Sequence, residues 1–139
     1  MTQIIYPMFA LVVLTFAVGL SLGISRLISA KKGQVDRRYF KLFSGYEAPD
    51  NIVKLSRNFS NLLEAPVLFY ILGTLVIALG INSSIILGSA WCFVALRLAH
   101  SLIHITYNNT IHRFLAFLVS SLLILIMWIE LIIIVIQRT

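Results

Sequence analysis

The chain has 139 residues, of which 60% are hydrophobic and 12% are charged, and its formal net charge at pH 7 is +6. Soluble domains carry about 25% charged residues, so this composition excludes an ordinary soluble enzyme and predicts a membrane-embedded protein. The length suits one compact domain, residues 1–139, with a few spanning helices and no separate soluble domain.

Four apolar stretches are long enough to cross a bilayer, which takes about 20 residues. We expect spanning helices at residues 4–30, 55–80, 83–107 and 113–136. The first has no charged start and runs far beyond the length of a signal peptide, which predicts a retained helix. The two later connections are short, so consecutive helices should be antiparallel neighbours in an all-α four-helix bundle.

The polar segment 31–54 connects the first two helices and contains every lysine of the chain. Because basic loops stay on the cytoplasmic side, this loop and the third loop are predicted to be cytoplasmic, with both termini outside. In a bacterium the protein would be an integral protein of the inner, or plasma, membrane. The positive net charge is then explained by topology and contact with anionic headgroups, and nucleic acid is not an expected partner.

A short polar row stands at the start of the second helix. Arg57, Asn61 and Glu64 are spaced by four and three residues, which puts their side chains on one helix face. Ionisable groups at membrane depth cost about 2.5–3.5 kcal/mol each on insertion scales, and they are usually paired and functional. The row therefore indicates a site.

Further polar residues lie at the same predicted depth on the other helices. They form a stripe on the third helix and stand at the cytoplasmic ends of the first and fourth: Arg97, His100, His104, Tyr107, Arg26 and Arg113. We expect them to converge with the second-helix row in a cationic pocket open to the cytosol. Arginine is suited to such a pocket because its guanidinium grips carboxylates through two hydrogen bonds.

Each group also has a simpler interpretation. Arg57 and Glu64 could form an interhelical ion pair, and Arg26 and Arg113 could reach out to lipid phosphates. A metal site at the two histidines is not favoured, since no cysteine shares their face. Cys92 is the single cysteine, so disulfides within the chain are excluded. Glu130 either pairs with Arg138 or closes another contact between helices.

The pattern Arg57-x-x-x-Asn61-x-x-Glu64, followed by Pro66 and an apolar run, resembles the second-helix signature of the MAPEG family. These are membrane-associated proteins in eicosanoid and glutathione metabolism, such as microsomal glutathione transferases. Arg97-x-x-His100 with a later Arg113 is similar to the prostaglandin E synthase branch. The resemblance implies a homotrimer that binds glutathione, its co-substrate, between subunits near the cytoplasmic face.

The resemblance also implies roles for individual residues. The second-helix row would contact the tripeptide, with Glu64 meeting the γ-glutamyl ammonium while arginines take the carboxylates. Arg113 would lie near the thiol and favour the thiolate, the nucleophilic form. The chain departs from the family pattern at Phe117, where a tyrosine is common, and at His104, which is tyrosine in some relatives.

Two functions follow as hypotheses. The first is a glutathione-dependent transferase or peroxidase that acts on a small lipophilic electrophile arriving through the bilayer, with Arg113 catalytic. The alternative is a non-catalytic membrane module that keeps the fold for binding or structure. A transporter is a weaker third, because a polar pocket on one side provides no path across the membrane.

Overall fold

The fold is that of a computed structural model, which describes residues 3–36, 38–43, 45 and 47–138. Helices are the only regular elements in these residues, and they occur in the order α1 (Ile5–Lys31), α2 (Tyr39–Leu42), α3 (Asp50–Glu64), α4 (Val67–Ala78), α5 (Ser84–Ile105) and α6 (Thr110–Arg138). Four segments are long and apolar enough to cross a membrane: α1, the combined stretch Asp50–Ala78, α5 and α6. The predicted all-α bundle of four spanning segments is confirmed.

The second span differs from the uninterrupted helix expected at 55–80. It begins at Asp50, directly after Pro49, and it is broken between α3 and α4 at Ala65 and Pro66. Pro66 has no backbone N–H and its ring crowds the carbonyl four residues earlier, so α3 ends just before it. The loop predicted at 31–54 also contains α2, and its residues 37, 44 and 46 lie outside the described part of the chain.

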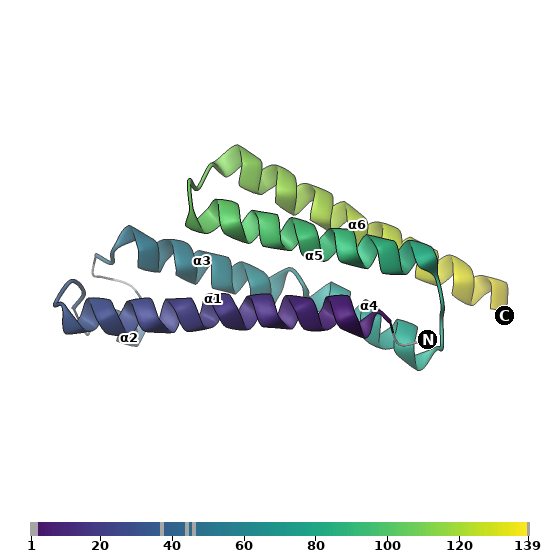
Figure 1. The fold of residues 1–139 in the computed structure, drawn as a ribbon, viewed down its shortest axis with the longest axis horizontal. Coiled ribbons are helices and arrows are strands. Elements are labelled where there is room, and N and C mark those ends of the chain that lie inside the picture. Colours follow the sequence, from purple (N-terminus) through teal and green to yellow (C-terminus); the bar gives the residue numbers. More distant parts are fainter. Residues whose placement is uncertain (1–2, 37, 44, 46, 139) are drawn as a thin grey trace.

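The helices form two layers in Figure 1. The α5–α6 hairpin lies over α1 and α3, and α4 continues from α3 at an angle. Both ends of the chain lie at one end of the bundle, whereas the long loop and the α5–α6 turn lie at the opposite end. This arrangement brings the N-terminal half of α3 together with the C-terminal end of α5 and the start of α6.

The hydrophobic core lies between the layers, toward the end of the bundle that holds the termini. Phe69 of α4 and Phe93 of α5 are buried, with ring centroids 4.8 Å apart. By contrast, the outer side of α1 exposes Phe9, Phe16 and Leu20 by 65%, 67% and 66%. A soluble protein rarely shows such a surface, whereas a spanning helix fits it to lipid or to another membrane helix.

The acidic residue of α6 closes a contact between helices. Ser83, at the N-cap of α5, donates from its Oγ to Glu130 Oε1 over 3.1 Å, and the same Oγ accepts from the backbone N of Ile86. Arg138 donates instead to the carbonyl of Leu79 at 2.9 Å. Glu130 and Arg138 therefore fasten α6 to the α4–α5 turn separately, and in the described residues they do not pair with each other.

Candidate functional site

Buried polar contacts join α3 to α5. Arg97 is fully buried, and its Nη2 donates to both the backbone oxygen and the Oδ1 of Asn61, each at 3.0 Å. One helical turn away, the buried Asn58 donates through Nδ2 to Ser101 Oγ at 2.6 Å. Asn58 and Ser101 were not predicted as site residues, although Asn58 stands three residues before Asn61 and so near the same face.

The charged residues of the predicted row lie at the exposed edges of the α3 face that carries Asn61. Arg57 and Glu64 are exposed, and neither forms an ion pair in the described residues. The interhelical ion pair considered from the sequence is therefore absent from this part of the chain. Two exposed charges on a spanning helix are costly unless something outside the single chain covers them.

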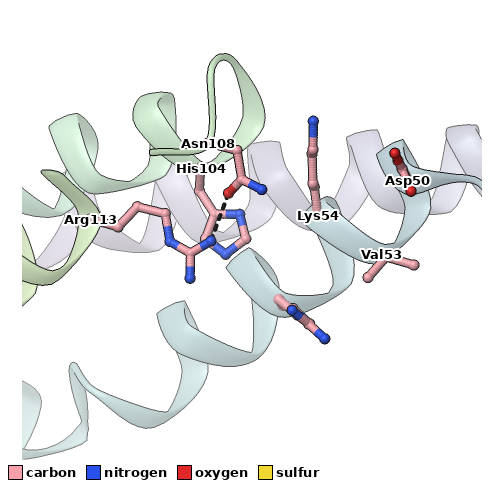
Figure 2. A pocket seen from close by; sticks show the side chains of 7 residues that line it. Asp50, Val53, Lys54, His104, Asn108 and Arg113 are labelled. Carbon is pink, nitrogen blue, oxygen red and sulfur yellow. Dashed lines mark hydrogen bonds between the residues drawn. The ribbon is translucent and has the colours of Figure 1, made fainter. Parts of the chain in front are cut away.

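A polar pocket opens at the loop end of the bundle, between α3 and the α5–α6 turn (Figure 2). Its volume is about 220 Å³, and its lining is mostly polar: Asp50, Val53, Lys54, Arg57, His104, Asn108 and Arg113. Arg113 Nη1 donates to Asn108 Oδ1 at 2.6 Å, and Asn108 has a φ of 51°, which asparagine tolerates better than most residues. With three Lys or Arg side chains and one carboxylate, this pocket favours an anionic ligand.

A second pocket lies on the other side of Arg113. Its volume is about 260 Å³, and it is lined by Asn61, His100, Thr110, Arg113, Phe114 and Phe117. The two phenylalanines give it an apolar wall that is partly exposed, while Asn61 and His100 come from the polar contact between α3 and α5. Arg113 thus lines both pockets, and its buried Nε has no hydrogen-bond partner in the described chain.

His100 and His104 stand behind these pockets. Both are buried, with ring centroids 5.9 Å apart in an edge-to-face arrangement. His100 lines the second pocket and His104 the first. Among the described residues no group of three His, Cys, Asp or Glu side chains is placed to hold a metal ion.

Three other residues predicted for the site lie elsewhere. Arg26 donates to Ser56 Oγ at 3.0 Å and sits over the ring of Phe43, 4.6 Å from its centroid. The hydroxyl of Tyr107 is 3.0 Å from Nδ1 of His112, outside both pockets of the described chain. Arg97 lies beneath the surface and reaches the second pocket only through Asn61. Three residues that line the first pocket were not predicted as site residues: Asp50, Lys54 and Asn108.

A family model described as the MAPEG family matches residues 4–133. The chain belongs to the MAPEG family. No significant match is found among curated proteins, and none among solved structures. Membership associates this MAPEG chain with membrane-bound eicosanoid and glutathione metabolism, and the family is generally oligomeric. Family membership and the four apolar spans together identify the chain as an integral membrane protein.

Proposed function

We propose that this MAPEG chain is a glutathione-dependent transferase or peroxidase that acts on lipophilic electrophiles. The observation that carries the proposal is the position of Arg113 in the walls of two unlike pockets. One pocket is cationic and suits the charged tripeptide, and the other has an aromatic wall that suits an apolar co-substrate. A thiol held at Arg113 would face both.

The first pocket has the charges that glutathione requires. Glutathione carries two carboxylates and one ammonium group, and Lys54 and Arg57 can hold the carboxylates as charge-assisted partners. Asp50 is the carboxylate of this pocket, but following the family resemblance we assign the ammonium to Glu64, which lies outside both pockets and has no ion-pair partner in the described residues. His104, Tyr107 and Arg26 are retained as candidate ligands from the polar residues predicted at one depth, with Tyr107 and Arg26 requiring rotation toward the site.

The chemistry follows from a positive charge beside the thiol. A thiolate is favoured over a thiol near a cation, and Arg113 stands in the first turn of α6, where the helix N-terminus adds partial positive charge. The thiolate sulfur would bond to the electrophilic carbon of the co-substrate, and the leaving group would depart with the electron pair of the broken bond. The proton of the thiol is released to solvent before this step.

The size of the pockets supports a site shared between subunits. Small-molecule sites usually enclose about 300–1,000 Å³, whereas the two pockets that Arg113 lines measure about 220 and 260 Å³ and are open. We therefore propose a homotrimer in which the second spans line the threefold axis. The exposed Arg57 and Glu64 would face a neighbouring subunit, which removes them from lipid.

The site also suits access from two directions. If the basic loop is cytoplasmic, the first pocket opens toward cytosolic glutathione, since it lies at the loop end of the bundle (Figure 2). Phe114 and Phe117 are exposed on α6 and would face the acyl chains, from which a lipophilic electrophile can enter the second pocket.

The test is turnover by detergent-purified protein with reduced glutathione and either an aromatic halide or a lipid hydroperoxide. The proposal predicts thioether formation or hydroperoxide reduction that saturates with glutathione. Saturable binding of glutathione without turnover of either substrate class would instead support the non-catalytic module.

A further inference from the structure

We infer that Arg97 is a positioning residue, which holds Asn61 and the last turn of α3 in place for glutathione. The inference rests on the proposed function. It differs from the place in the wall of the cationic pocket that the polar stripe on the third helix predicted for Arg97.

The burial of Arg97 separates it from the two pockets that Arg113 lines in the described residues. Its exposed fraction is 0%, and in the described residues it lines neither of the two pockets that Arg113 lines. Its hydrogen bonds in the described residues both go to Asn61, one to the backbone oxygen and one to the side-chain oxygen. No carboxylate of the described chain pairs with it.

The contact lies in the last turn of α3, where an arginine is well placed. Pro66 has no N–H to donate to the carbonyl of Leu62, which prevents α3 from continuing. The carbonyl of Asn61 receives the backbone N of Ala65 at 3.2 Å and Arg97 Nη2 at 3.0 Å. A cation is also favourable at a helix C-terminus, where the carbonyls carry partial negative charge.

Arg97 affects the second pocket through the side chain of Asn61. Asn61 lines that pocket together with Arg113, and its Oδ1 is held by Arg97 from behind. With Oδ1 occupied, the amide nitrogen of Asn61 is left to donate toward a ligand. Arg97 thus fixes both where Asn61 stands and which of its atoms faces the pocket.

The same helix pair contains a matched control. Asn58 and Ser101 form a buried hydrogen bond between α3 and α5, and neither lines the pockets of the described chain. Ser101→Ala therefore weakens the interface between α3 and α5 without removing a contact to Asn61.

The test is a double-mutant cycle on the Kd for reduced glutathione. Arg97→Lys keeps the charge but loses the planar fork of donors, and it should raise Kd about tenfold. In the Asn61→Ala background the same change should add less than about threefold, because the side chain that Arg97 positions is gone and only its contact to the backbone oxygen at position 61 remains. Ser101→Ala should lower the melting temperature and leave Kd within about twofold of the wild type.

The possible results separate a failure of the proposed function from a failure of the positioning role of Arg97. If the wild type shows no saturable binding, the proposed function fails and this inference fails with it. If the wild type binds but the losses from Arg97→Lys and Asn61→Ala multiply, Arg97 acts on the ligand independently and only the inference is overturned. An unchanged Kd for Arg97→Lys overturns it as well.

A measurement on the unaltered protein covers the case in which the lysine variant does not fold. Phenylglyoxal modifies accessible arginines, and mass spectrometry locates the adducts. Arg97 should remain unmodified with or without glutathione, whereas Arg57 and Arg113 should react and be protected by the ligand. Modification of Arg97 in the free protein, with protection by glutathione, would overturn the positioning role.

Discussion

Replacing Arg113 with leucine should raise the pKa of the thiol of bound glutathione and remove most of the nucleophile. An opposite charge within about 4–6 Å shifts a pKa by about 1–3 units. Two units would lower a thiol from its reference value of about 8.5 to about 6.5. At pH 7 the thiolate fraction would then be about 75% in the wild type and about 3% in the variant, a loss of about 25-fold.

The structure indicates which part of the activity should change. Lys54 and Arg57 line the first pocket independently of Arg113, so the carboxylates of glutathione keep their partners and binding should weaken less than turnover. The assay is the ultraviolet absorbance of the bound thiolate, followed as a function of pH beside the rate of conjugation. Since the folded-site pKa is lowered by Arg113, the wild type should keep its thiolate down to about pH 6.5, while the variant should recover it only above about pH 8.5.

Two control variants separate the loss of the positive charge at position 113 from an effect of the substitution on folding. Arg113→Lys keeps a positive charge and should retain a lowered thiol pKa, whereas Arg138→Leu removes a charge at the other end of α6 and should leave the titration unchanged. If Arg113→Leu binds glutathione with the same thiolate titration as the wild type, Arg113 does not stabilise the thiolate and the reasoning is refuted.

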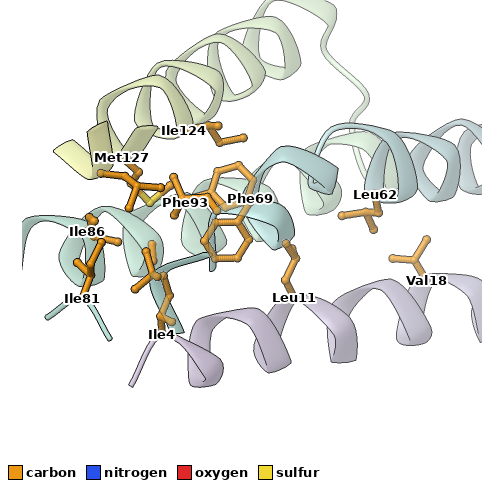
Figure 3. Packing of buried hydrophobic residues seen from close by; sticks show 14 residues of the cluster. Ile4, Leu11, Val18, Leu62, Phe69, Ile81, Ile86, Phe93, Ile124 and Met127 are labelled. Carbon is orange, nitrogen blue, oxygen red and sulfur yellow. The ribbon is translucent and has the colours of Figure 1, made fainter. Parts of the chain in front are cut away.

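Native mass spectrometry in detergent should give a mass of three chains, because Arg57 and Glu64 need a partner surface; a stable monomer or dimer would contradict this. Phe93→Ala should destabilise the protein by about 3 kcal/mol, since it empties the space beside Phe69 in the core (Figure 3). The lipid-facing Phe16→Ala is its control and should change the melting temperature little; equal losses from both variants would show that the core does not carry the stability.

The spanning segments were predictable because hydropathy and length together determine them. The break in the second span was missed, since an average over apolar residues does not register the absent N–H of Pro66. The sequence nevertheless contained that signal, because a proline directly after Glu64 cannot continue a regular helix without losing a hydrogen bond.

The site was predictable only as a set of helix faces. The spacing of Arg97, His100 and His104 put them on one face, and all three are buried together. The spacing of residues places them on one helix face, but it does not say which edge of that face packs against a neighbouring helix. It therefore did not separate the exposed Glu64 from Asn61, which turns toward α5 and accepts from Arg97.

The central claim is that the chain binds glutathione, and thermal unfolding of the detergent-purified protein tests it most directly. Reduced glutathione at saturation should raise the melting temperature of the wild type, and ligand at about 100 times its Kd adds about 2.7 kcal/mol of stability. The rise should shrink in Arg57→Ala and in Glu64→Ala at the same ligand concentration. A melting temperature unchanged by reduced, oxidised and S-alkyl glutathione alike would contradict the account.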